Sequence, residues 1–199
     1  MTTQLDALVG LGNPGDRYTR TRHNAGFWFL DEIARQQAET FRYERRLHGD
    51  AAEIRLADRK VRLLKPDTFV NESGRAAQAL LSYYKLEPSA CLVVYDELDL
   101  EPGVVRFKRG GGHGGHNGLR SIISSLGSNG FPRLRIGIGH PGRKSAVTGY
   151  VLSRPPAQDQ TLIDGAIDKA GSLLPDYVSG QWDAATKALH TAEGDDRGI

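Results

Sequence analysis

The sequence predicts an α/β fold, a single-domain twisted mixed β-sheet flanked by helices. Apolar runs with strand character alternate irregularly with amphipathic helical stretches, and one pair of runs forms a hairpin. The continuous apolar run Cys91–Tyr95 is typical of a strand that is buried on both faces. A chain of 199 residues without a visible linker or repeat suits one domain. We therefore expect one domain over residues 1–192 and a flexible tail over 193–199.

Apolar spacing predicts the elements of the first half of the chain. They are a strand at Leu5–Leu11, a helix from Asn24 to about Gln37, a hairpin of Ala51–Ala57 with Lys60–Lys65 around Asp58-Arg59, and a helix ending at Tyr84. Asn24 is expected to cap the first helix, and Asn71 or Ser73 the second. Residues 38–50 are polar and expected to be irregular, and Pro66 is expected to end the hairpin strand.

The second half of the chain is expected to hold three strands and three helices. The strands are Cys91–Tyr95, Val104–Lys108 and Arg133–Gly139, and the helices are Leu119–Leu126, about 158–178 and Trp182–His190. Gly110–Gly118 is expected to be a loop, because six of its nine residues are glycine. Gly142–Ser145 reads as a basic turn, and Pro175 is expected to stop the long helix early.

Composition excludes several classes of protein. No apolar run approaches the ~20 residues of a membrane span, and the N-terminus lacks the pattern of a signal peptide. The single cysteine, Cys91, excludes an internal disulfide and suits a reducing compartment. We therefore expect a cytoplasmic protein that associates with no membrane.

Basic residues are concentrated in one segment. The net charge is only +2, but the stretch from Val104 to Ser145 contains eight Lys or Arg residues and no Asp or Glu. Such a segment on an otherwise acidic chain favours a polyanionic partner such as a nucleic acid. The alternative is a basic face that only aids solubility.

Most enzyme signatures are absent or weak. Gly10-x-Gly12-x-x-Gly15 fits the dinucleotide-binding pattern as a string, but no apolar helical face follows it. Cys91 lies in an apolar strand, where a thiol is usually inert. His113 and His116 lack a third metal ligand nearby. The remaining possibility is general acid–base catalysis on a water, without metal or cofactor.

Acid–base catalysis needs a neutral histidine held by a carboxylate. His23 stands at an expected helix start beside the loop after the first strand, and Asp96 stands at the carboxyl end of an expected central strand. Each also has a simpler explanation, as a helix-end histidine and a turn carboxylate. Asn13, Asn71 and Asn117 follow extended segments, where their amides could bind a peptide backbone or cap a helix.

The chain resembles bacterial peptidyl-tRNA hydrolases over roughly residues 4–190. Six blocks carry the resemblance in the family's order: GLGNPG (10–15), Tyr18 followed by TRHNAG (21–26), KPDTFVNESG (65–74), YDELDLEPG (95–103), GGGHGGHNGLRSII (110–123) and RLRIGIGHPG (133–142). The chain departs at Val70, where the family usually has methionine, so we expect a reshaped pocket wall there.

The resemblance implies a metal-free esterase that releases the peptide from peptidyl-tRNA and regenerates tRNA. By match to the family, His23 is the catalytic base, Asp96 orients it, and Asn13 helps select peptide-bearing substrate. The positions that match substrate and tRNA contacts are Tyr18, Phe69, Asn71, Asn117, Lys108 and Arg135, with His116 in the active-site wall. No obligate protein partner is implied, and nothing requires more than a monomer.

Two other functions stay open on the residues alone. One is a non-catalytic RNA-binding module of the same fold, which would keep the basic face without the chemistry. The other is a nucleotide-dependent oxidoreductase that uses Gly10–Gly15 as a cofactor loop. Intact His23, Asp96 and Asn13 argue against the first, and the missing helix after the loop argues against the second.

Overall fold

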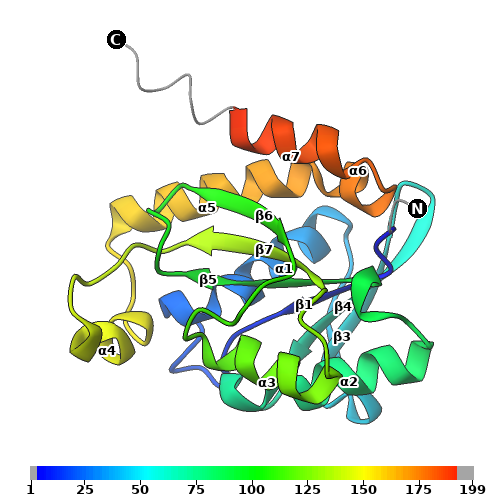
Figure 1. Ribbon diagram of the computed structural model, residues 1–199, viewed down its shortest axis with the longest axis horizontal. Helices are drawn as coiled ribbons and strands as arrows, with labels where there is room; N and C mark the ends of the chain where they lie inside the picture. The colour runs from blue at the N-terminus through cyan, green and yellow to red at the C-terminus, as the bar shows by residue number, and fades with distance from the viewer. Residues whose placement is uncertain (1–3, 192–199) are drawn as a thin grey trace.

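The computed structural model describes residues 4–191, whose centre is a seven-stranded mixed sheet (Figure 1). The strand order is β2-β3-β4-β1-β5-β7-β6. The strands are β1 Ala7–Gly10, β2 Arg42–Glu44, β3 Gly49–Leu56, β4 Arg59–Pro66, β5 Cys91–Glu97, β6 Val105–Arg109 and β7 Pro132–Gly137. The predicted α/β class with a mixed sheet is confirmed. The expected tail, 193–199, lies outside the described residues.

The centre of the sheet is parallel and its margins are antiparallel. β4, β1, β5 and β7 are parallel neighbours, whereas β2–β3, β3–β4 and β6–β7 pair antiparallel. Parallel strands end at the same edge of a sheet, where α/β proteins bind their ligands. The loop after β1 leads to His23, the loop after β4 leads to Asn71, and β5 ends at Asp96-Glu97. This edge therefore gathers residues that are far apart in the sequence.

Helices cover both faces of the sheet (Figure 1). On one face lie α1 (Ala25–Gln36), α5 (Ala157–Ser172), α6 (Leu174–Val178) and α7 (Trp182–Thr191), and on the other lie α2 (Ser73–Tyr84) and α3 (Asn117–Leu126). Alternate residues of β5 face the two cores, Leu92 and Val94 on the α1 side and Val93 and Tyr95 on the α2 side. A strand between two cores needs apolar residues throughout, which is why this run was recognisable. Among residues 4–191, no helix is long and apolar enough to cross a membrane.

Two glycines allow α1 to lie directly against the sheet. A Cβ atom on Gly26 would overlap backbone atoms of Leu11 and Val94, and one on Gly10 would overlap the Gly26 carbonyl. Gly26 follows His23 by three residues. The close packing of α1 on β1 and β5 therefore also fixes the position of the turn that carries His23.

Several local predictions are corrected by the structure. The segment 38–50 contains the edge strand β2, whose three exposed residues carry no apolar signal. The β3–β4 turn is Ala57-Asp58, one residue earlier than expected, with positive φ at both residues. The long C-terminal helix is two helices, and Pro175 lies in the first turn of α6, where its missing N–H costs nothing. A short helix, α4 (Val147–Val151), was not expected.

The expected helix caps are also corrected. Asn24 precedes α1 without capping it through its side chain, which bonds the backbone of Asn13 instead. Asn71 lies in a 3-10 turn before α2, and the Ser73 hydroxyl donates to the Val70 carbonyl. Neither therefore caps α2 through its side chain. The side chain that caps α3 belongs to His116.

Candidate active site

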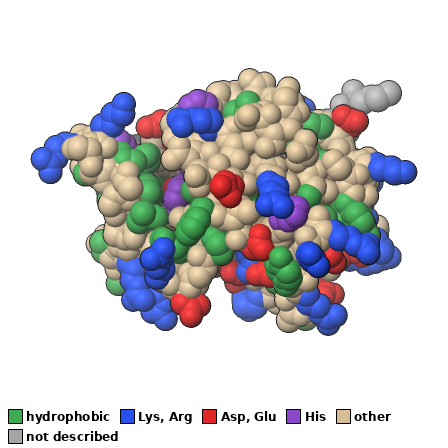
Figure 2. All heavy atoms as spheres, turned by 90° about the horizontal axis from the view of Figure 1, so that it is seen from below, with side chains coloured by type: hydrophobic (Ala, Val, Ile, Leu, Met, Phe, Trp, Pro, Cys, Tyr) green, Lys and Arg blue, Asp and Glu red, His purple; other side chains and the backbone are tan. Residues whose placement is uncertain are grey.

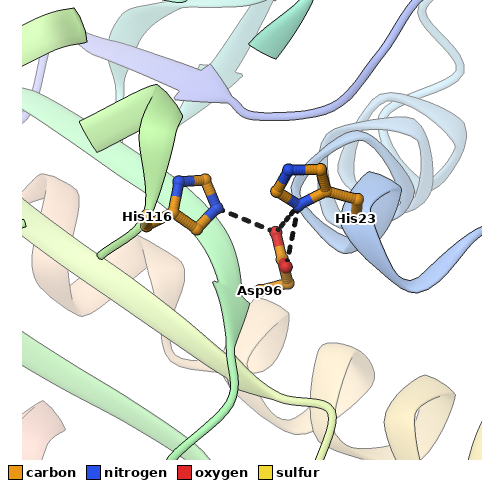
Figure 3. A group of neighbouring side chains, drawn as sticks. All are labelled: His23, Asp96 and His116. Atoms are coloured by element: carbon orange, nitrogen blue, oxygen red, sulfur yellow. Dashed lines mark hydrogen bonds and ion pairs between the residues drawn. The ribbon is translucent and has the colours of Figure 1, made fainter. Parts of the chain in front are cut away.

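Two histidines and one aspartate meet at the carboxyl edge of the sheet (Figure 3). His23 comes from the 3-10 turn Arg22–Asn24, Asp96 from the end of β5, and His116 from the residue before α3. Nδ1 of His23 lies 2.9 Å from both carboxylate oxygens of Asp96, and Nε2 of His116 lies 3.0 Å from Oδ1. All three side chains are nearly or fully buried, so the expected pair of His23 and Asp96 is present and has a third member.

Charge and burial oppose each other at this pair. Burial alone would lower the pKa of His23, but the charge and hydrogen bond of Asp96 outweigh it and raise the pKa above 6.5. Burial would likewise raise the pKa of Asp96, yet the two imidazoles hold it well below 3.8. Asp96 is therefore a permanent anion near neutral pH, and it stabilises the protonated form of His23.

Asn13 is fixed in one orientation. Its backbone N–H donates to Oδ1 of Asn24 at 2.9 Å, and Nδ2 of Asn24 donates to its carbonyl at 3.0 Å. Its own Oδ1 accepts the Val70 N–H at 2.8 Å. The bond from Val70 occupies the side-chain oxygen of Asn13 and leaves the side-chain NH2 group as a donor. Asn24 and Val70 thus support the site in a way that the sequence pattern did not reveal.

A pocket of about 610 Å³ surrounds these groups. Its lining includes His23, Asn13, Asn71 and Asn117, so the structure brings together three amides from loops distant in the sequence. Asn71 and Asn117 are exposed, unlike Asn13. Figure 2, which views the molecule from the α2–α3 side, shows histidine and hydrophobic side chains together toward the end where α4 lies, with Lys and Arg around them.

An aromatic pair stands at the pocket. Tyr18 and Phe69 line it and meet edge to face, with ring centroids 6.0 Å apart. Phe69 is 51% exposed, a large fraction for a phenylalanine. The guanidinium of Arg17 lies over the Tyr18 ring at 4.5 Å. A half-buried tyrosine ring beside a cation, next to an exposed phenylalanine ring, suits contact with a planar or nucleic-acid ligand.

Sequence reasoning missed a further wall of the pocket. Val147, Thr148 and Val151 of α4 line it. The buried side chain of Arg22, next to His23, donates from Nη1 to Ser153 Oγ at 2.7 Å, which links the chain after α4 to the turn that carries His23. The apolar spacing of Val147 and Val151 was a possible signal for a helix. Nothing in the sequence distinguishes Arg22 from the exposed arginines near it.

Four of the eight cations of the basic segment share one face of the β6–β7 ribbon. In the antiparallel register Arg106 lies opposite Arg135 and Lys108 opposite Arg133, so all four point to the same side. Lys108 is exposed, and Nε of Arg135 donates to Glu97 at 2.9 Å. Both lie outside the pocket. Four cations are therefore gathered on this ribbon, but not all of them are at the surface.

Arg133 is the exception on this face. It is 1% exposed, and its guanidinium donates to the carbonyls of Gly111 and Gly112 and to the more distant carbonyl of Asn129. It holds the glycine-rich loop that leads to His116. Its inclusion in a polyanion-binding surface is thus corrected, because its donors are used inside the protein.

The alternative chemistries find little support in the geometry. The Gly10–Gly15 loop is followed by turns, and α1 begins only at Ala25, so the helix does not open within the loop as the dinucleotide-binding pattern requires. Cys91 is buried, and burial raises its pKa to about 12. The ligand-type atoms of His23, Asp96 and His116 lie within 4.8 Å of one another. Nδ1 of His23 and Nε2 of His116 are both hydrogen-bonded to Asp96.

Comparisons with known proteins show the family to which the chain is similar over nearly its whole length. A model of the peptidyl-tRNA hydrolase family matches residues 7–196. The chain is 50% identical to the peptidyl-tRNA hydrolase of Neisseria gonorrhoeae over 191 residues, which are 96% of this chain and 100% of the relative. It is 53% identical to that of Acidithiobacillus ferrooxidans over 184 residues, which are 92% of this chain and 97% of the relative.

Solved structures show the same architecture. A crystal structure of peptidyl-tRNA hydrolase from Acinetobacter baumannii matches with a TM-score of 0.92 at 45% identity, over 95% of this chain and 96% of that chain. A complex of peptidyl-tRNA hydrolase with N-propanol matches with a TM-score of 0.90 at 46% identity, over 93% and 94%. The resemblance based on the six sequence blocks is confirmed.

Proposed function

The chain belongs to the peptidyl-tRNA hydrolase family, which hydrolyses the ester between peptide and tRNA, and we propose that His23 activates the attacking water in this reaction. The observation that carries the proposal is the buried hydrogen bond of 2.9 Å between Nδ1 of His23 and Asp96. That bond leaves Nε2, which points away from Asp96, available to a water in the pocket (Figure 3). A base oriented in this way is what ester hydrolysis by water requires.

The reaction needs one proton to move twice. The water oxygen attacks the ester carbonyl carbon while its proton passes to Nε2 of His23, which forms a tetrahedral oxyanion. When the intermediate collapses, the bond to the ribose oxygen breaks and this oxygen takes the proton from His23. The products are a peptide with a free carboxyl group and a tRNA with its hydroxyl restored. Asp96 stabilises the imidazolium between the two transfers, and such catalysis contributes about 10²–10⁴-fold.

Amides suit the recognition of the peptide. With the oxygen of Asn13 bonded to Val70, its NH2 group is the donor offered to a substrate carbonyl or to the oxyanion. Asn71 and Asn117 line the same pocket from two other loops and can bond backbone groups that every peptide shares. Binding would then depend on the presence of a peptide, not on its side chains. This fits a preference of Asn13 for peptide-bearing substrate over free aminoacyl-tRNA.

The tRNA is expected to extend away from the pocket along the basic face. Tyr18 and Phe69 would contact the tRNA 3′ end or the peptide at the pocket, and Lys108 and Arg135 would approach phosphate oxygens beyond it. Phosphate contacts position a nucleic acid without reading its sequence. Such an arrangement suits an enzyme that accepts many tRNAs, and its affinity should fall as salt rises.

The proposed reaction also indicates where the enzyme works and whether it needs partners. We place it in the cytoplasm, where peptidyl-tRNA arises during translation, as one domain over residues 1–192 that works without an obligate protein partner or a membrane. The alternative of a non-catalytic RNA-binding module is not favoured, because relatives about half identical over nearly the whole chain are hydrolases.

His23→Ala tests the proposed base. We expect hydrolysis of purified peptidyl-tRNA under single-turnover conditions to fall by about 10²–10⁴-fold, while tRNA affinity stays near wild type and the variant remains folded. His140→Ala is the matched control, because His140 is exposed and lies outside the pocket lining. Turnover by the His23 variant within tenfold of wild type would remove His23 from the mechanism.

A further inference from the structure

The second histidine of the cluster has two separate contacts (Figure 3). His116 stands before α3, where Ser, Thr, Asp or Asn is the usual capping residue. Its Nδ1 accepts the backbone N–H groups of Gly118 at 3.1 Å and Leu119 at 3.4 Å. Its Nε2 lies 3.0 Å from Oδ1 of Asp96. One ring therefore caps a helix and contacts the carboxylate that orients His23.

The cap determines where the proton of this ring sits. A ring nitrogen that accepts backbone N–H groups carries no proton, so the proton of His116 is on Nε2 and is donated to Asp96. A second proton on Nδ1 would break both cap bonds and add positive charge at the positive end of the α3 dipole. The Tyr95 and His116 rings pack in a T-shaped contact, with centroids 5.2 Å apart, which helps to keep His116 in place. The His116 ring thus donates from Nε2 to Asp96 while its Nδ1 caps α3.

We propose that His116 is a positioning residue which weakens the hold of Asp96 on a proton at His23, and so keeps the base neutral at the pH of the reaction. This inference rests on the proposed role of His23. Oδ1 of Asp96 is shared by two donors, His23 at 2.9 Å and His116 at 3.0 Å. A carboxylate oxygen that already accepts one strong hydrogen bond holds less negative charge for the second donor.

Other ionisable groups do not take this role. Those that also line the pocket are Tyr18, Tyr95, Glu97, His113 and Lys144. Within residues 4–191 none of them hydrogen-bonds Asp96, and Glu97 is engaged by Arg135. Among the described residues, the side chains that hydrogen-bond this carboxylate are those of His23 and His116. Removing the hydrogen bond from His116 therefore strengthens the interaction of Asp96 with His23.

Two substitutions separate the two contacts of His116. In His116→Asn the side-chain oxygen replaces Nδ1, which keeps the helix cap and removes the donor to Asp96. In His116→Gln the amide nitrogen replaces Nε2, which keeps a donor and removes the cap. We expect the pKa of His23, and with it the acidic limb of the kcat/KM profile, to rise by about one unit in His116→Asn. In His116→Gln that limb should stay near wild type while the melting temperature falls by about 2–4 °C.

An NMR titration of the His23 ring in labelled full-length protein is the direct measurement, with the pH profile on peptidyl-tRNA beside it. His116→Ser, which also caps a helix but is too short to reach Asp96, repeats the test if the Asn variant folds poorly. A pKa of His23 that does not rise in the donor-free variants, or that rises equally in His116→Gln, overturns the proposal. The titration needs no turnover, so a raised pKa with an unmoved kinetic limb would support the effect of His116 and refute His23 as the base.

Discussion

Replacing Asp96 with asparagine changes charge and hydrogen bonding but hardly changes size. The carboxylate presents one oxygen to both imidazoles and the other, also at 2.9 Å, to Nδ1 of His23. Asparagine has one oxygen and one NH2 group. If the asparagine oxygen takes the place of Oδ1, its NH2 group takes the place of Oδ2 and faces Nδ1 of His23. If the amide is flipped, its NH2 group faces both Nδ1 of His23 and Nε2 of His116. In either orientation an NH2 donor faces Nδ1 of His23 and favours the tautomer in which Nδ1 carries no proton. The structure thus predicts that the proton of His23 shifts to Nε2.

That shift removes the free nitrogen that must take the proton of the water. The expected loss in single-turnover rate is therefore the contribution of a general base, about 10²–10⁴-fold. The variant also lacks the negative charge that raises the pKa of His23, so the acidic limb of its residual activity should move to lower pH. This direction is opposite to the one expected for His116→Asn.

The assay is single-turnover hydrolysis of labelled peptidyl-tRNA across a range of pH, with tRNA affinity and melting temperature measured on the same samples. Asp99→Asn is a matched control, because Asp99 is an exposed carboxylate three residues along the chain that lies outside the pocket lining. An Asp96→Asn enzyme with near wild-type turnover and an unmoved acidic limb would refute the assigned tautomer and the role of the carboxylate.

Three further predictions follow from the fold and its charges. Lys108→Ala should weaken tRNA binding and reduce the slope of log K against log salt by about 0.7–0.9, the value of one phosphate contact, and fluorescence titrations that show an unchanged slope would exclude that contact. Arg135→Ala should raise KM more than Lys108→Ala does, because it also leaves a carboxylate on β5 without its partner; an equal or smaller rise in steady-state assays would contradict this. Gly26→Ala should lower the free energy of unfolding by about 1–3 kcal/mol in denaturant titrations, because the added Cβ would overlap the backbone of β1 and β5; an unchanged midpoint would contradict the packing.

The stability of the fold should depend on pH through the His23–Asp96 pair. Because the pKa of His23 is raised in the folded state, the stability that protonated His23 contributes is fully present below the unfolded value of 6.5. It is lost as pH rises through the higher folded-state pKa. The melting temperature of the wild type should therefore decline over this window more than that of Asp96→Asn. Parallel curves for the two proteins would contradict the sign of the shift.

Segments with strong local patterns could be predicted from the sequence. Cys91–Tyr95 was recognisable because each of these five residues is buried against one core or the other. β2 was not, because an exposed edge strand of three residues has no apolar alternation. The Asn24 side chain was assigned to a cap because asparagine often caps helices, yet a buried backbone partner at Asn13 takes it instead. Tertiary contacts of this kind leave no trace in local spacing.

The sequence by itself determined the α/β class, the family and the identity of His23 and Asp96 as candidates, because motifs and apolar periodicity are local patterns of the chain. Only the tertiary structure decided that Asp96 carries two imidazoles and that Arg133 is buried while Lys108 is exposed. His23 and Asp96 are 73 residues apart, and Asp96 and His116 are 20 apart. They meet because neighbouring parallel strands end at one edge of the sheet and a buried arginine holds the loop that returns to it. Burial and hydrogen-bond partners depend on that packing, so spacing along the chain cannot supply them.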